Sequence, residues 1–359
     1  MAWKVFSVST STWGDRIEVP ADTFSGGRQL NATSPGAATF LTKNAKVREV
    51  VTPVTMAKLR RALVVEWNRI PVYAGLIVDT DRDVFTGVLE VQLADLWWIW
   101  KSRHVLPMHG AGVEKLPPLV FTGHLATIAK KAIQEGMDAA PLARYDLPIV
   151  WEDDLPGPYT REYYGYKFPS VADALDELIK TDGGPDIDFP PQWAPDFKLQ
   201  WAMRSGNLVG GYWEWDATTK KTDIIGIKEK GSGANVANKV IGTGEGSGED
   251  ILVKAEESFA TSDFPALERV VSYSGISNRD QLAARARADV EAQNEPTQQL
   301  SVSIRPDGAV APSELLLGGT VRVNLKEAFY VPNGWSDWRL LGFTFSEDSV
   351  DLQLQQQGG

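Results

Sequence analysis

The sequence predicts a mainly β fold with a helix-containing α+β insert in the middle of the chain. Apolar residues alternate with polar ones over residues 62–96, recur at helical spacing between residues 125 and 179, and alternate again after residue 206. A period of two is typical of strands with one buried face, and a spacing of three and four is typical of helices. We therefore expect three domains, at residues 1–115, 116–205 and 206–359.

The clearest pattern in the first β region is an antiparallel meander over residues 62–96. Its three strands are separated by Asn68-Arg69 and by the polar run 79–83. A short helix capped by Thr55 and ending at Arg61 is expected just before it. The basic residues Lys58, Arg60 and Arg61 would then form a solvated helix face or contact an acidic neighbour. Earlier strands are predicted at Lys4–Ser9, Arg28–Ala32 and Thr39–Thr42.

The insert carries two predicted helices. The first starts near Leu125, and Gly136 is placed to stop it. The second begins with Ser170-Val171-Ala172-Asp173, which has the spacing of a capping box, and continues to Ile179. Pro- and Trp-bearing stretches around these helices, Trp151–Tyr164 and Pro185–Trp193, are typical of segments that drape over a neighbour.

The second β region contains a hairpin, a helix and three closing strands. Leu208–Trp215 and Thr222–Lys228 are predicted to pair around Ala217-Thr218-Thr219. Strands Lys239–Ile241 and Ile251–Ser258 flank a Gly/Glu-rich loop. A helix is expected from Arg279 to Gln293, with Asn278 as its cap and Leu282, Ala286 and Val290 as its buried line. The closing strands are centred on residues 300–305, 321–326 and 350–355.

Composition and charge argue against several classes of function. The 359 residues carry a formal net charge of −11, which disfavours a general grip on nucleic acid phosphates. The chain has no cysteine, so it has neither disulfides nor thiolate metal sites. The amino terminus lacks the apolar core of a signal peptide, and the longest apolar runs are too short to cross a bilayer. We expect no membrane insertion by this chain and synthesis in the cytoplasm.

Two motifs suggest ion or phosphate binding, and each has a simpler interpretation. Asp79, Asp81, Asp83 and Glu90 have the spacing of a calcium loop, but Val84 stands where such a loop needs glycine. A solvated hairpin turn explains them better. The glycine-rich runs 231–233 and 242–248 lack the Lys-Ser/Thr of a phosphate loop and contain or adjoin acidic residues, so a flexible loop explains them better.

The sequence shows no zinc-binding histidine motif and no serine-nucleophile motif. His104, His109 and His124 do not fall in a zinc-binding pattern, and no nucleophile elbow surrounds a serine. We expect no catalytic residue, no metal ligand and no cofactor.

Acidic residues beside tryptophans leave two alternatives open. Glu152–Asp154 follow Trp151, and Glu214 and Asp216 alternate with Trp213 and Trp215. Paired carboxylates beside aromatic platforms are typical of glycoside hydrolases, which predicts turnover that is lost when Glu152 or Glu214 is neutralised. The same rings favour non-catalytic glycan contact, and Trp151, Trp213 and Trp215 are the candidate residues.

Three stretches resemble the tail-tip hub proteins of tailed bacteriophages, the minor tail proteins of long non-contractile tails. Val64–Ile77 is similar to a strand–turn–strand that ends in Ala-Gly-x-Ile, here Ala74-Gly75-Leu76-Ile77. Leu89–Leu96 resembles the strand that leaves the first barrel through an Asp-Leu step. Leu267–Leu325 is similar to the strands and crossover helix of the second barrel.

This resemblance implies two related β-barrel hub domains separated by the insert, and no enzyme activity. It implies a homotrimer whose ring closes the tail tube and adapts a six-fold tube to a three-fold tip at the distal end of the virion tail. Its expected partners are the distal tail protein ring, the tape measure protein and further tip or fibre proteins. Genomic DNA would pass through the lumen without specific binding. The alternative function is a non-catalytic adhesion module that binds host cell-wall glycan.

Overall fold

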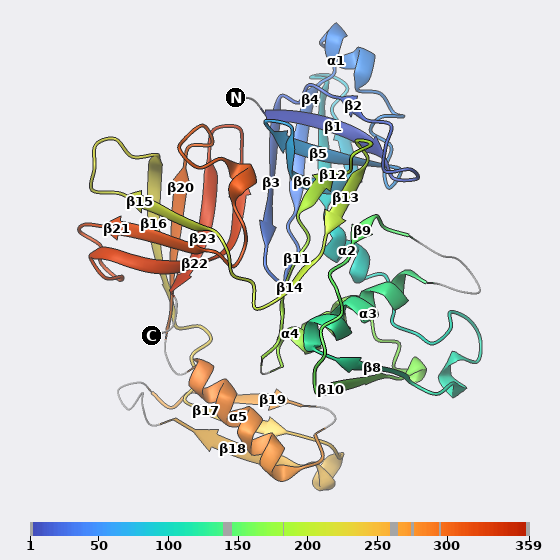
Figure 1. The fold of residues 1–359 in the computed structure, drawn as a ribbon, viewed down its shortest axis with the longest axis vertical. Coiled ribbons are helices and arrows are strands. Elements are labelled where there is room, and N and C mark those ends of the chain that lie inside the picture. The colour runs from blue at the N-terminus through green and yellow to red at the C-terminus, as the bar shows by residue number, and fades with distance from the viewer. Residues whose placement is uncertain are drawn as a thin grey trace. The chain divides into compact units, whose positions relative to one another are not determined.

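The computed structural model describes residues 3–138, 146–181, 183–258, 265–273, 276–293 and 296–356. These residues form two compact units. Unit 1 contains Met1–Ile227, Ser301–Lys326 and Gly334–Gly359, and unit 2 contains Lys228–Leu300 and Glu327–Asn333. The mainly β fold with a helix-containing insert is confirmed (Figure 1).

The first β region of unit 1 is built on the predicted meander (Figure 1, blue). Its strands are β1 (Trp3–Ser9), β2 (Ile17–Glu18), β3 (Thr23–Gln29), β4 (Gly36–Leu41), β5 (Arg61–Trp67), β6 (Ile70–Arg82) and β7 (Val88–Ala94), with helix α1 (Ala45–Val50) between β4 and β5. β5, β6 and β7 pair antiparallel in sequence order, which confirms the meander. Asn68 and Arg69 both have positive φ, as the tight turns that join twisted strands require.

The insert places its helices against one face of the meander. Its helices are α3 (Leu125–Met137), α4 (Val171–Ile179) and the short η2 (Gly165–Lys167), and α2 (Leu96–Trp100) and the short η1 (Val113–Lys115) lead into it. Its strands are β8 (Leu119–Gly123), β9 (Ile149–Val150), β10 (Tyr159–Tyr163), β11 (Asp186–Asp188), β12 (Pro191–Trp193), β13 (Leu199–Ala202) and β14 (Arg204–Gly206). Both predicted helices are confirmed, and Ser170 and Asp173 form the complete capping box.

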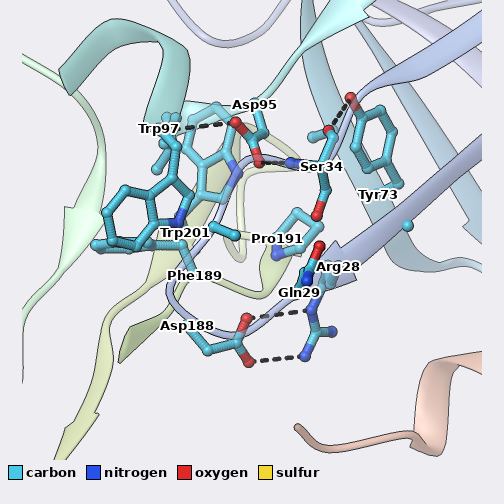
Figure 2. Close-up of a pocket in the computed structure, with 14 residues that line it drawn as sticks. Arg28, Gln29, Ser34, Tyr73, Asp95, Trp97, Asp188, Phe189, Pro191 and Trp201 are labelled. Atoms are coloured by element: carbon cyan, nitrogen blue, oxygen red, sulfur yellow. Dashed lines mark hydrogen bonds and ion pairs between the residues drawn. The ribbon is translucent and has the colours of Figure 1, made fainter. Parts of the chain in front are cut away.

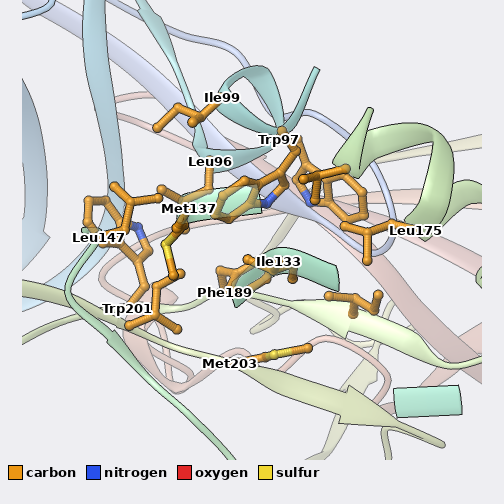
Figure 3. Packing of buried hydrophobic residues seen from close by; sticks show 14 of the residues in the cluster. Leu96, Trp97, Ile99, Ile133, Met137, Leu147, Leu175, Phe189, Trp201 and Met203 are labelled. Carbon is orange, nitrogen blue, oxygen red and sulfur yellow. The ribbon is translucent and has the colours of Figure 1, made fainter. Parts of the chain in front are cut away.

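One hydrophobic core joins the insert to the first β region (Figure 3). Trp97, Ile133, Leu175 and Trp201 lie in it together with Val64 of β5. Residues of β5 on the opposite face are also buried, so all seven positions of this strand are inaccessible to solvent. Burial on both faces fits the run of apolar residues at 62–65 in this strand, and its two charged residues, Arg61 and Glu66, are buried as well.

The second β region continues the same sheet. Its strands are β15 (Tyr212–Asp216), β16 (Ile224–Ser232), β20 (Thr297–Ile304), β21 (Thr320–Leu325), β22 (Gly334–Phe345) and β23 (Val350–Gln356), with the short η5 (Pro312–Glu314). The main path of the thirteen-stranded sheet runs β16-β20-β23-β22-β3-β4-β7-β6-β5-β1-β2, and β15 and β21 branch from β22. The β22–β3 pair therefore joins the two β regions.

Unit 2 is a three-stranded sheet with one helix. Strands β17 (Lys239–Thr243), β18 (Val253–Glu257) and β19 (Glu268–Ser272) pair in the order β18-β17-β19, with η3 (Gly248–Asp250) between β17 and β18. Helix α5 (Arg279–Gln293) buries Leu282, Ala286 and Val290, as predicted. The Asn278 side chain accepts hydrogen bonds from the N–H groups of Asp280 and Gln281, which confirms the predicted cap.

Three local predictions are wrong, and one long strand was not predicted. The predicted pairing of Leu208–Trp215 with Thr222–Lys228 does not form, because β15 pairs in parallel with β21 while β16 pairs with β20. β22 was missed because a bulge between Leu340 and Gly342 breaks its period of two. The strand expected at Arg28–Ala32 is β3, which ends at Gln29.

The third error is the helix from Thr55 to Arg61. The Thr55 hydroxyl instead donates to the carbonyl of Val50, and the chain passes through turns into β5. Arg61 opens β5 and is buried, where it donates to Ser7 and Asp15. The basic cluster is therefore not a solvated helix face, and Arg61 instead contacts an acidic neighbour, Asp15, which is the other expectation for this cluster. In the described part of the chain, no helix is both long and apolar enough to span a bilayer.

Candidate functional site: the junction of the two β regions

The junction is built on the antiparallel pairing of β3 with β22. Phe343 lies opposite Arg28, and Thr344 lies opposite Gly27. Glycine is required here, because a Cβ on Gly27 would lie 2.3 Å from the carbonyl oxygen of Phe343. A Cβ on Gly26 would lie 2.8 Å from the ring of Tyr73. The two glycines let β3 approach β22 on one side and a buried aromatic ring on the other.

Tyr73 is a fully buried phenol beside this junction. Its hydroxyl donates to the carbonyl of Ser34 at 3.1 Å (Figure 2). Burial raises the pKa of Tyr73 well above its ordinary value, and the nearby negative charge of Asp95 adds to the shift. The phenol is therefore neutral and acts as a hydrogen-bond donor.

Asp95 is the last residue before α2 and fixes the loop that leads into β4. Its carboxylate accepts from the N–H of Ser34 at 2.6 Å and from the N–H of Trp97 at 3.1 Å. Burial raises its pKa to about 6, against the lowering effect of these hydrogen bonds. The Asp95-Leu96 step thus links the end of the meander, the first turn of α2 and the Ser34 loop.

An ion-pair network fastens β11 of the insert to both β regions. Asp188 is buried and accepts from Arg28 of β3 at 2.8 Å and from Arg204 of β14 at 3.2 Å. Two residues earlier, Asp186 pairs with Arg339 of β22. Because Arg28 and Arg339 come from the two strands at the junction, β11 acts as a cross-brace between the first and second β regions.

The space enclosed at the junction is too small for a substrate. A cavity of about 30 Å³ lies between Ser34, Asp95, Asp188 and Trp201 (Figure 2). A buried water needs on the order of 10–15 Å³ and several polar partners, so the cavity has room for one or two waters. The arrangement is a polar joint that holds three parts of the fold in register.

The carboxylates considered for hydrolysis are engaged by separate partners. Glu152 accepts from the N–H and hydroxyl of Ser205, at 2.9 Å and 2.8 Å, and lines a pocket of about 240 Å³ beside α3. Asp154 pairs with Lys130, and Glu214 accepts from Tyr212 at 2.7 Å. Asp216 accepts from Thr218 and from Asn324.

The three tryptophans considered for glycan contact differ in exposure. Trp213 and Trp215 are buried. The ring of Trp213 packs closely on Gly211, because a Cβ added to that glycine would lie only 2.2 Å from the ring. Trp151 is half-buried and packs against the core shared with the insert. Of these three, Trp151 alone offers ring surface to a sugar, and glycan contact stays a prediction.

One of the histidines and one residue of the acidic hairpin cap backbone N–H groups. The Nδ1 atom of His124 accepts from the N–H of Ala126 and caps α3, which sequence reasoning missed because histidine is an uncommon cap. Burial lowers the pKa of His109.

Asp79 and Asp81 lie on the extended β6, while the Asp83 carboxylate caps the turn by accepting from the N–H groups of Phe85 and Thr86. Among the described residues, no group of three or more His, Asp or Glu side chains is arranged to hold a metal ion.

Comparisons with known proteins give likeness in fold only. No family model matches the sequence, and no curated protein matches it. The 43 kDa tail protein of prophage MuSo2 from Shewanella oneidensis has a TM-score of 0.63 at 10% identity, covering 98% of both chains. A tail protein from Neisseria meningitidis has a TM-score of 0.58 at 15% identity, covering 100% of this chain and 98% of the other.

A third solved structure extends the likeness. A prophage tail protein from Listeria monocytogenes has a TM-score of 0.54 at 10% identity, covering 99% of this chain and 94% of the other. All three alignments run over nearly the whole length of both chains, so the likeness includes both β regions and the insert. The chain has the fold of prophage tail proteins.

Proposed function

We propose that this chain is a structural component of a phage tail tip, a baseplate hub without enzyme activity. The observation that carries the proposal is the full-length fold likeness to three prophage tail proteins. The braced β3–β22 junction supports it, because a hub needs a rigid wall and not a substrate cleft. In this proposal the barrel hub domains are residues 1–115 and 206–359, with the insert at 116–205.

The proposed assembly is a ring of three copies that closes the tail tube and adapts its six-fold symmetry to a three-fold tip. Each copy would supply two β regions, so three copies present six similar walls around the lumen. A net charge of −11 per chain would let genomic DNA pass without adhering. The ring would contact the distal tail protein ring, the tape measure protein and further tip or fibre proteins.

Labelled electron microscopy of the virion tests this proposal. A small peptide tag on the carboxyl terminus, decorated with an antibody fragment, should place the chain at the distal end of the tube. Three labels per tail are expected. Label on the capsid or along the tube wall would contradict the proposal.

A second candidate function is glycan contact through Trp151, whose ring is partly exposed beside the exposed Glu152 and Asp153. Binding of the purified chain to host cell-wall polysaccharide should weaken at least about tenfold in Trp151→Ala, which removes about 1.4 kcal/mol of binding free energy. Trp98→Ala, another tryptophan with exposed ring surface, is the matched control. Equal binding of both variants would remove this candidate.

A further inference from the structure

A groove of about 610 Å³ lies in unit 1 outside the junction described above. One wall is the outer edge of β1 and β2, and the other is formed by the turns at residues 305–307 and 347–348 of the second β region. This groove is about twenty times larger than the junction cavity. Its size suits a peptide side chain with its flanking backbone.

Three aromatic residues line the groove, and the one nearest the chain terminus is held rigidly. The Trp3 ring stacks on Phe345 with centroids 4.9 Å apart, and its Nε1 donates to the carbonyl of Glu347 at 3.0 Å. Phe24 and Trp67 contact it edge-on, at 5.5 Å and 4.7 Å. A fixed aromatic surface loses little conformational entropy when an apolar side chain packs on it.

Trp67 contributes little accessible surface to the groove, because it is only 3% exposed. Its edge-on contact with Trp3, with ring centroids 4.7 Å apart, instead helps to hold the Trp3 ring in place.

The charged residues of the groove are mainly acidic. Its lining contains four carboxylates, which are Glu18, Asp307, Glu347 and Asp348, and two cations, Lys4 and Arg305. Lys4 pairs with Glu18 at 2.8 Å, and Arg305 pairs with Asp223 at 2.9 Å. The groove therefore has a net negative charge, with Glu347 and Asp348 exposed on one side. It is complementary to lysine or arginine.

The edge of the sheet at the groove is incomplete. β2 is two residues long and pairs only with Phe6 and Ser7 of β1. Within the described residues, Trp3 and Lys4 thus have no strand beside them on this edge, while Val5 accepts one hydrogen bond from Val19. Open edges accept extended peptides by adding a strand.

We propose that this groove binds an extended segment of a partner protein, in which lysine or arginine flanks an apolar side chain. The apolar side chain would pack on Trp3 and Phe24, and the cations would face Asp307 and Asp348. The inference rests on the proposed tail-tip function and deepens it by identifying where a neighbouring tail protein attaches.

Site-specific photocrosslinking in assembled particles tests the inference. p-Benzoylphenylalanine is placed at Ala21, which lines the groove without contributing charge or ring surface. The matched control position is Glu114, which is exposed outside the groove. Irradiation should join position 21, but not position 114, to a peptide of another tail protein with net positive charge, identified by mass spectrometry.

The outcomes separate the two proposals. If the label places the chain at the tail tip but position 21 yields no adduct, or an adduct with an acidic segment or with glycan, the groove inference is wrong and the tail-tip proposal stands. If the label lies elsewhere, the tail-tip proposal is wrong.

Charge reversal provides a second measurement. Asp307→Lys with Asp348→Lys should lower the adduct yield from position 21 at least about tenfold, because the partner's cations are repelled. Glu49→Lys with Glu114→Lys changes the net charge equally at exposed positions outside the groove and should leave the yield unchanged. Unchanged thermal unfolding of both double variants shows that they fold. Equal yields from the two variants would contradict the inference.

Discussion

At the residue scale, the most informative side chains are buried charges. Asp188, Asp95, Arg61 and Glu66 are all buried or nearly so in unit 1. Glu66 accepts from Arg16 and from the indole of Trp193, each at 3.1 Å. Buried charges are tolerated only when they are paired and hydrogen-bonded. Here they join segments that are far apart in the sequence.

Asp188→Asn should destabilise the fold strongly. The substitution leaves Arg28 and Arg204 without a carboxylate at a site where Asp188 itself is 3% exposed. Breaking a buried pair costs about 3–5 kcal/mol, which urea unfolding followed by tryptophan fluorescence would measure. Asp196→Asn, which removes an exposed pair with Lys198, is the control and should unfold as the unmodified chain does.

Asp95 predicts a pH dependence of stability. Its pKa is about 6 in the folded chain and 3.8 as a reference, so the folded state binds a proton more tightly than the unfolded state does. This group therefore stabilises the fold as pH falls from 7 through 6 towards 4, by at most about 3 kcal/mol.

The difference in unfolding free energy between the unmodified chain and Asp95→Asn isolates this effect from other groups. The unfolding free energy of the unmodified chain should rise relative to that of Asp95→Asn as pH falls from 7 to 4.5. A difference that stays constant over this range would show that Asp95 does not titrate there.

At the scale of single elements, the strands with clear alternation and three of the α-helices could be predicted from the sequence, whereas α1, α2 and the short insert strands β8–β14 were not predicted. The meander, both insert helices and α5 follow from local periodicity and caps, which need no knowledge of distant segments. The parallel pairing of β15 with β21 could not be predicted, because about a hundred residues lie between them and no local signal marks a long-range partner. β22 was not predicted because its bulge interrupts the alternation of apolar and polar residues. The buried position of Arg61 could not be predicted either, because its partners Ser7 and Asp15 are distant in sequence.

Gly27→Ala tests the close contact between β3 and β22. The added methyl would meet the Phe343 carbonyl at 2.3 Å, so the strands must separate, at a cost of about 1–3 kcal/mol. Chemical denaturation would measure this cost. Gly110→Ala, where nothing lies within 4 Å of the added carbon, should unfold at the same denaturant concentration as the unmodified chain.

At the scale of the whole molecule, the two units have separate cores. Val240, Ala286 and Val290 form the core of unit 2, and the larger core in Figure 3 belongs to unit 1. The sequence predicted the α5 face of the smaller core. It did not predict the junction that carries the candidate site, because Arg28, Asp188 and Arg339 come from three distant segments.

Val240→Asp should unfold unit 2 while unit 1 stays folded, because an unpaired carboxylate is placed in the smaller core alone. Hydrogen exchange read by mass spectrometry should show lost protection in β17 and α5 and retained protection in β5 and β6. Ile241→Asp, on the neighbouring and less buried position of β17, is the control and should exchange more slowly than Val240→Asp. Equal loss of protection in β5 would show that the units unfold together.

The long strand β22 has a mechanical consequence. It pairs with β21 through its first half and with β3 through its second half, while β23 runs along its other edge. A tensile load along this strand would be shared by the backbone hydrogen bonds that β22 makes with β21, β3 and β23, which are loaded in shear. Atomic-force pulling between the two β regions should accordingly meet one high rupture event rather than a series of low ones.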